Sequence, residues 1–119
     1  MRILLVDDEI EFISTLADRL ALRGIAADYA TSGRQALEKV HQANYQLALL
    51  DMKMAGLDGF ETMAQIRRDF PEMKFIILTG HGDEEAYLKS QKIGVAFYLM
   101  KPLDIDVLIE KIKQALEER

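Results

Sequence analysis

The stretch Ile3-Leu4-Leu5-Val6-Asp7-Asp8 opens the chain with four apolar residues that run directly into two acids. A run this short cannot form a buried helix, and its lack of alternation is typical of a strand covered on both faces. Leu47–Leu50 and Phe75–Leu78 have the same form and are followed by Asp51 and Thr79. The three runs therefore predict the central strands of a parallel sheet.

Amphipathic segments lie between these runs. Apolar residues recur at three- and four-residue spacing from Ile13 to Leu20 and again from Ile105 to Leu116, which indicates helices. The mixed runs Ile25–Tyr29 and Val95–Met100 suit edge strands, and Glu84–Ile93 is the least firmly packed of five predicted helices. We expect an α/β fold of the flavodoxin-like type: a doubly wound, five-stranded parallel sheet in the order 2-1-3-4-5, flanked by five helices.

Length and composition restrict the function. A chain of 119 residues suits a single domain, 1–119. A net charge of −5 argues against gripping nucleic acid or an anionic membrane, and the lack of cysteine excludes disulfides and thiolate metal sites. No apolar run approaches the roughly 18 residues that a membrane span requires, and the N-terminus is unlike a signal peptide. We expect a cytoplasmic domain with no direct contact to nucleic acid or membrane.

Polar side chains follow four of the predicted strands, and the carboxyl ends of parallel strands meet at one edge of a sheet. The residues in question are Asp7, Asp8, Asp51, Thr79 and Lys101. Each has a simpler interpretation, such as a helix cap for the acid pair or a solvated surface position for the lysine. Together they place three carboxylates in one pocket, where their repulsion would either raise a carboxyl pKa or demand a cation. Lys101 alone cannot neutralise them, but a divalent metal would, and hard oxygen ligands suit Mg²⁺.

This set fits phosphoryl transfer to a carboxylate. Asp51 would be the nucleophile that forms an acyl phosphate. Mg²⁺, held by Asp8 and Asp51 with support from Asp7, would neutralise charge on the transferring group. Lys101 and the Thr79 hydroxyl would bind the phosphoryl oxygens.

Over its whole length the chain resembles the receiver domains of two-component response regulators, of which the chemotaxis regulator is the smallest single-domain kind. The resemblance rests on four motifs in order: Asp7-Asp8, Asp51-Met52-Lys53-Met54 with Asp58-Gly59, Leu78-Thr79-Gly80-His81-Gly82, and Phe97-Tyr98-Leu99-Met100-Lys101-Pro102. The third motif is also similar to receivers attached to sigma-54-type activators.

The resemblance implies a phosphoacceptor and a metal site. Asp51 would take the phosphoryl group from the phosphohistidine of a sensor histidine kinase or phosphotransfer protein. Asp7, Asp8, Asp51 and the backbone carbonyl of Lys53 would form the Mg²⁺ site, which Mn²⁺ could also occupy. The family usually has proline at the place of Ala55, a departure that affects no ligand side chain.

The resemblance also implies a switch rather than a turnover enzyme. Thr79 and Tyr98 would form the switch pair, and a cis Lys101–Pro102 peptide bond would aim the phosphate-binding lysine into the pocket. Lys53 and His81 would tune the lifetime of the acyl phosphate. The surface formed by the fourth helix, the fifth strand and the last helix would then control an output or partner, including a second copy of the chain.

Two other functions are open at this point. The first is a receiver-like interaction module that takes no phosphate. The second is a magnesium-dependent phosphohydrolase, which would need a second acid where this chain has Lys53. A flavin site is disfavoured, because acids follow the first strand in place of a Gly/Ser/Thr phosphate loop. The sequence leaves open whether the chain stands alone or is part of a longer protein.

Overall fold

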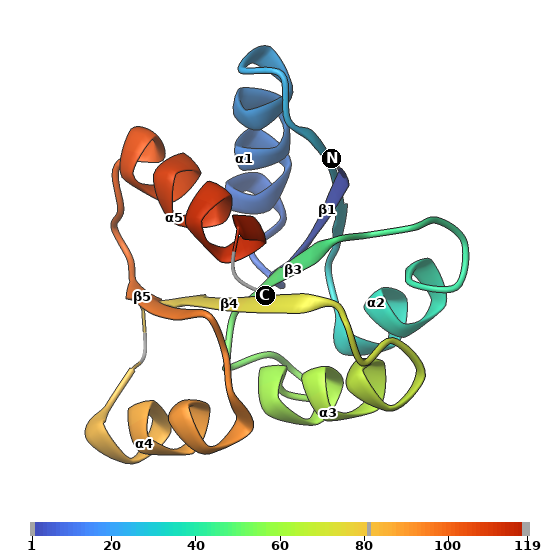
Figure 1. The fold of residues 1–119 in the computed structure, drawn as a ribbon, viewed down its shortest axis with the longest axis vertical. Helices are drawn as coiled ribbons and strands as arrows, with labels where there is room; N and C mark the ends of the chain where they lie inside the picture. Colours follow the sequence, from blue (N-terminus) through green and yellow to red (C-terminus); the bar gives the residue numbers. More distant parts are fainter. Residues whose placement is uncertain (1, 81, 118–119) are drawn as a thin grey trace.

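Five strands alternate with five helices in the computed structural model, which describes residues 2–80 and 82–117 (Figure 1). The strands are β1 (Arg2–Val6), β2 (Ala26–Ala30), β3 (Leu47–Leu50), β4 (Lys74–Thr79) and β5 (Phe97–Met100). The helices are α1 (Ile10–Leu22), α2 (Gly33–Lys39), α3 (Gly59–Asp69), α4 (Glu84–Ile93) and α5 (Ile105–Glu117). All strand pairs are parallel and the order is β2-β1-β3-β4-β5, so the predicted topology is confirmed.

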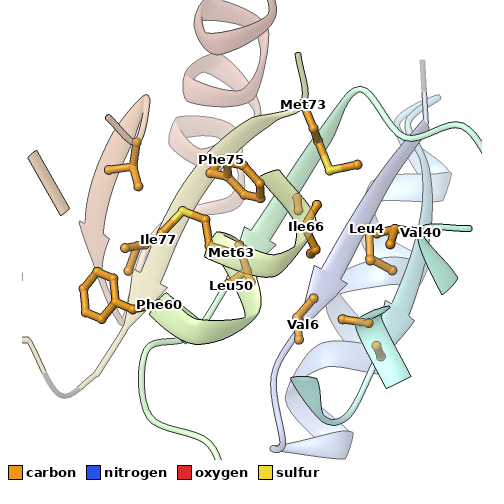
Figure 2. Close-up of a cluster of buried hydrophobic side chains, with 14 of the residues drawn as sticks. Leu4, Val6, Val40, Leu50, Phe60, Met63, Ile66, Met73, Phe75 and Ile77 are labelled. Carbon is orange, nitrogen blue, oxygen red and sulfur yellow. The ribbon is translucent and has the colours of Figure 1, made fainter. Parts of the chain in front are cut away.

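The central strands contain continuous apolar runs because helices cover both faces of the sheet. Ile3 and Leu5 of β1 pack in a core with α1 and α5, whereas Leu4 and Val6 pack in a second core. Figure 2 shows this second core, where side chains of α3 meet those of the central strands. Full burial of one such side chain contributes about 1.5–3 kcal/mol to the stability of the fold. Apolar residues on both faces of a strand are therefore explained by the two cores, one on each face.

Side-chain caps begin three of the helices. Ser32, Asp58 and Asp83 each accept a hydrogen bond from the backbone N–H three residues later, at 3.1, 2.8 and 2.8 Å. In contrast, α1 begins after Glu9 with no capping side chain in the described chain. The simpler interpretation of Asp8 as the capping residue of this helix is therefore wrong.

Helix α4 is the least firmly packed, as predicted. Of its described residues, only Ser90 is fully buried, whereas α5 buries Ile105, Leu108, Ile112 and Ala115. Tyr87 and Leu88 of α4 are exposed. A helix with so few buried contacts can shift at little cost in free energy.

An ion-paired network ties β1 and β2 to the loop before β3. Asp28 Oδ2 accepts hydrogen bonds from Arg2 Nε at 2.9 Å and from the Tyr45 hydroxyl at 2.6 Å. Burial and the neighbouring carboxylate raise the pKa of Tyr45 to about 12. Burial raises the pKa of Asp28, but the hydrogen bonds from Tyr45 and Arg2 more than offset it and leave the pKa below its usual value.

Within residues 2–80 and 82–117, none of the helices combines the length and the apolar character that crossing a bilayer requires.

Candidate functional site

Four strands end at the same edge of the sheet and deliver the predicted polar residues there. Val6 is in register with Leu50, and Leu50 with Ile77, so Asp7 and Asp51 leave neighbouring strands side by side. Thr79 closes β4 opposite Met100, and Lys101 follows directly. The structure brings all five predicted pocket residues together at this edge, although they are far apart in sequence.

Asp51 is fixed from three sides. Its side chain is 3% exposed, and its Oδ1 accepts hydrogen bonds from Thr79 Oγ1 at 2.7 Å and from the Lys53 backbone N–H at 3.3 Å. Its own N–H donates to the Val6 carbonyl at 3.0 Å. The carboxylate is thus held in one orientation, with its second oxygen turned toward Lys101 at 3.5 Å.

Gly59 allows the chain to pass close behind Asp51. A Cβ at this position would overlap the Asp51 carbonyl oxygen and would lie 3.0 Å from both the Asp51 carbonyl carbon and Met52 Cα. The Gly59 N–H donates to the Met52 carbonyl at 2.9 Å. The start of α3 therefore packs directly against the turn that carries the Asp51 carboxylate. This close contact explains why glycine follows Asp58 in the motif.

Asp7 is a buried acid with one partner for each oxygen. Its side chain is 2% exposed, Oδ1 accepts the Glu9 N–H at 2.9 Å, and Oδ2 accepts Lys101 Nζ at 2.7 Å. Burial raises the pKa of Asp7, although the bonds from Lys101 and Glu9 act in the opposite direction. Folding therefore places a carboxylate in surroundings where negative charge needs a cation nearby.

Asp8 is exposed and points to the loop after β3. Its Oδ2 accepts the Ala55 N–H at 3.4 Å, a donor that a proline at this position would lack. The expectation that alanine in place of proline affects no ligand side chain is therefore wrong. One carboxylate oxygen from each of Asp7, Asp8 and Asp51 lies within 4.8 Å of the other two. Three hard oxygens with one open, solvated side suit a divalent cation that keeps some of its waters, and Mg²⁺ binds in this way.

Lys101 supplies the positive charge of the pocket. Its Nζ lies 2.7 Å from Asp7 Oδ2, 3.1 Å from Glu9 Oε1 and 3.5 Å from Asp51 Oδ2, and 4.4 Å from the centre of the Phe12 ring. Burial lowers the pKa of Lys101, but the hydrogen bonds to Asp7 and Glu9 more than offset it, so the pKa is raised. The ammonium therefore stays charged at neutral pH. The Lys101–Pro102 peptide bond is cis.

The Tyr98 hydroxyl lies in a small space left by Gly82. It is buried and makes no hydrogen bond within the described part of the chain. A Cβ on Gly82 would overlap this hydroxyl and would lie 2.6 Å from Met100 Sδ. The Tyr98 ring packs edge-on against Tyr87, with ring centres 5.6 Å apart. The pKa of Tyr98 is raised, first by burial and then by the negative charge of Asp83. The nearby Asp83 backbone N–H lowers this pKa, but by less.

One further predicted residue and two unpredicted ones lie at the site. Lys53 is exposed beside Asp51, and His81 lies outside the described residues. Sequence reasoning assigned no role to Glu9 or Phe12, both of which contact Lys101. The only signal in the sequence was the third acid of the Asp7-Asp8-Glu9 run, because the partner of Glu9 is more than 90 residues away in the chain.

Comparisons with known proteins identify the family of this chain. Residues 3–113 match the response regulator receiver domain family. The transcriptional regulatory protein ZraR of Escherichia coli K12 is 38% identical over 114 residues, which are 96% of this chain and 26% of that protein. The chain thus spans about a quarter of the length of this curated relative.

Solved structures give the same result. A CheY-like response regulator receiver domain protein from Methanospirillum hungatei superposes with a TM-score of 0.92 at 32% identity, covering 98% of this chain and 93% of the other. The response regulator TrrA of Thermotoga maritima, solved in complex with Mg²⁺ and BeF, has a TM-score of 0.84 at 35% identity, covering 96% and 97%.

Proposed function

This chain belongs to the response regulator receiver domain family, and we propose that it is a phosphoacceptor switch in which Asp51 takes a phosphoryl group from a histidine kinase. The observation that carries the proposal is the arrangement around Asp51. A buried carboxylate has a hydroxyl donor at 2.7 Å and an ammonium at 3.5 Å, beside two further acids. A merely structural aspartate would not need both donors and two like charges next to it.

The transfer exchanges one bond for another. An Asp51 carboxylate oxygen forms a bond to phosphorus as the P–N bond of the phosphohistidine breaks. The electron pair of that bond returns to the imidazole nitrogen, which takes up a proton. The buried turn formed by Asp51 and Met52 holds the attacking oxygen in place, so little orientation is lost during the reaction.

The charges of the pocket suit this step. Asp7, Asp8 and Asp51 would hold Mg²⁺ together with the Lys53 backbone carbonyl, and the bound ion would neutralise charge on the transferring phosphoryl group. The Lys101 ammonium is a charge-assisted donor for a phosphoryl oxygen. The Thr79 hydroxyl, which donates to Asp51 in this structure, could turn to a phosphoryl oxygen once Asp51 is phosphorylated.

We define the switch face as the surface of α4, β5 and α5. It carries the exposed apolar side chains Tyr87, Leu88, Met100 and Val107. The Tyr98 ring on β5 contacts α4 through Tyr87, and α4 is the helix with the fewest buried residues. Movement of Thr79 and Tyr98 would therefore alter this face at low cost, and the face would bind an output segment or a second copy.

The partners follow from this function. The donor would be a sensor histidine kinase or a phosphotransfer protein, which leaves with its histidine dephosphorylated, and the result of the transfer would be a switched state of this chain. Since relatives such as ZraR are transcriptional regulatory proteins, control of transcription is the output that we propose for the whole protein.

Amide NMR with beryllofluoride, a mimic of the phosphoryl group, tests the switch. With Mg²⁺ present, we expect the largest chemical shift changes between Thr79 and Met100, and none in the Asp51→Asn variant. Asp58→Asn is the matched control, because Asp58 caps α3 and does not touch the ligand site. Lack of any Mg²⁺-dependent change in the native protein would contradict the proposal and favour a phosphate-independent interaction module.

A further inference from the structure

Glu9 is an acid beside the pocket to which neither the motif nor the proposed metal site assigns a role. It lies between β1 and α1, and its N–H donates to Asp7 Oδ1 at 2.9 Å. Its carboxylate Oε1 accepts a hydrogen bond from Lys101 Nζ at 3.1 Å. The backbone of Glu9 is thus tied to Asp7, while its side chain reaches across to the lysine that follows β5.

The contacts of Lys101 are unequal and come mostly from one side. Asp7 and Glu9 lie at 2.7 and 3.1 Å from the ammonium, whereas Asp51 lies at 3.5 Å. The Phe12 ring belongs to α1, and its centre lies 4.4 Å from the ammonium nitrogen. Three of the four groups that hold the ammonium therefore come from the turn after β1 and from α1. The phosphoacceptor has the weakest contact of the three acids.

We propose that Glu9 is a positioning residue that holds Lys101 on the α1 side of the pocket and thereby opposes its engagement of a phosphoryl group on Asp51. This inference rests on the proposed function, since a phosphoryl group on Asp51 is the partner for which Lys101 leaves Glu9. Phosphorylation of the Asp51 carboxylate brings new negative charge to the side where the ammonium contact is now longest. Lys101 then exchanges Glu9 for a phosphoryl oxygen.

Burial explains why Glu9 is the contact that is released. The Glu9 side chain is 60% exposed, so water solvates its carboxylate as soon as the ammonium leaves. The Asp7 side chain is 2% exposed, and losing its cation would leave a buried charge unpaired. An exposed pair contributes little free energy, so Glu9 sets a weak bias that phosphorylation can overcome.

The first experiment follows Lys101 directly in the full chain without Mg²⁺ or phosphate. The Nζ and Cε resonances of Lys101 are assigned by their loss in Lys101→Met, and are then compared in Glu9→Gln and Glu11→Gln. Glu11→Gln is the matched control, because it also removes one negative charge near the start of α1. Among the described residues, Glu11 forms no ion pair with Lys101. We expect a clear shift only in Glu9→Gln, and equal effects of both variants would overturn the proposal.

The second experiment measures, in the presence of Mg²⁺, the beryllofluoride concentration at which half of the domain is bound to beryllofluoride. Glu9→Gln should lower it about two- to fivefold, the size expected for an exposed pair, and Glu11→Gln should leave it unchanged. Glu9→Asp keeps the charge but shortens the side chain by one methylene, so it should behave like Glu9→Gln. Native behaviour of Glu9→Asp would show a distant charge effect in place of a contact, and would overturn the positioning role.

The two proposals fail in different ways. If the native chain binds beryllofluoride and Glu9→Gln binds it equally well, only the role of Glu9 is wrong. If the native chain binds none, the phosphoacceptor function is wrong and the role of Glu9 falls with it.

Discussion

Gly59→Ala probes how the fold holds Asp51 in place. The new Cβ would overlap the Asp51 carbonyl oxygen and would lie 3.0 Å from the Asp51 carbonyl carbon and from Met52 Cα. All three are backbone atoms, which cannot turn away as a flexible side chain can. The overlap must therefore be relieved by moving either the start of α3 or the turn that carries the phosphoacceptor.

The size of the effect follows from these distances. Carbon atoms pack at about 3.5–4.0 Å, so the contacts at 3.0 Å require a shift of about 0.5–1 Å, and the closer overlap with the Asp51 carbonyl oxygen requires at least the upper end of that range. Overpacking of this kind costs about 1–3 kcal/mol, and the better helix propensity of alanine returns less than about 1 kcal/mol. We expect the free energy of unfolding to fall by about 1–2 kcal/mol. A displacement of this size at Asp51 would also slow phosphorylation, by up to about 100-fold.

Urea unfolding followed by circular dichroism measures the stability, and acetyl phosphate with Mg²⁺ measures the phosphorylation rate. Gly80→Ala is the matched control, because its Cβ would meet only Lys101 side-chain carbons at 3.9 and 4.0 Å, an ordinary contact. The control should stay within about 0.5 kcal/mol of the native chain. If Gly59→Ala matched the control in both assays, the close packing of α3 on Asp51 would not be what positions the carboxylate.

Three further predictions concern other residues. Tyr45→Phe should lower the free energy of unfolding by about 0.5–1.5 kcal/mol at pH 7. Folding raises the pKa of Tyr45 from 10.0 to about 12, so the difference in unfolding free energy between variant and native chain is full below pH 10 and should shrink as the pH rises toward 12. Urea titrations that give a constant difference over this pH range would contradict this. Gly82→Ala should expel the Tyr98 hydroxyl and shift the Tyr98 ring resonances, and unchanged resonances would refute the proposed fit. Lys53→Ala and His81→Ala should change the dephosphorylation rate of the phosphorylated chain, and unchanged rates in both would exclude their role in its lifetime.

Much of the fold could be predicted because the apolar pattern of each strand indicates which of its faces are buried. Ile3–Val6 and Leu47–Leu50 are apolar on both faces, which only a sheet covered on two sides explains. The small number of apolar positions in Glu84–Ile93 likewise predicted the helix with the fewest buried residues. Edge positions were less precise: Ile25–Tyr29 becomes Ala26–Ala30, because pairing to β1 decides which residues join the sheet.

The pocket was predictable for a topological reason. In a parallel sheet, the residue after each strand goes to the same edge, so Asp7, Asp51 and Lys101 could be grouped without knowledge of any distance. Their exact partners could not be predicted. The Glu9–Lys101 contact joins residues from opposite ends of the chain, and the place of Gly59 behind Asp51 depends on how α3 packs. Such contacts arise from tertiary structure and leave no local pattern.

The central claim is that Asp51 accepts a phosphoryl group with help from a cation held by the three acids. Intact-mass spectrometry after incubation with acetyl phosphate, with and without Mg²⁺, tests it most directly. We predict that the native chain gains the mass of one phosphoryl group only when Mg²⁺ is present, that EDTA prevents the gain, and that Asp51→Asn abolishes it. No gain in the native chain, or an equal gain in Asp51→Asn, would contradict the claim.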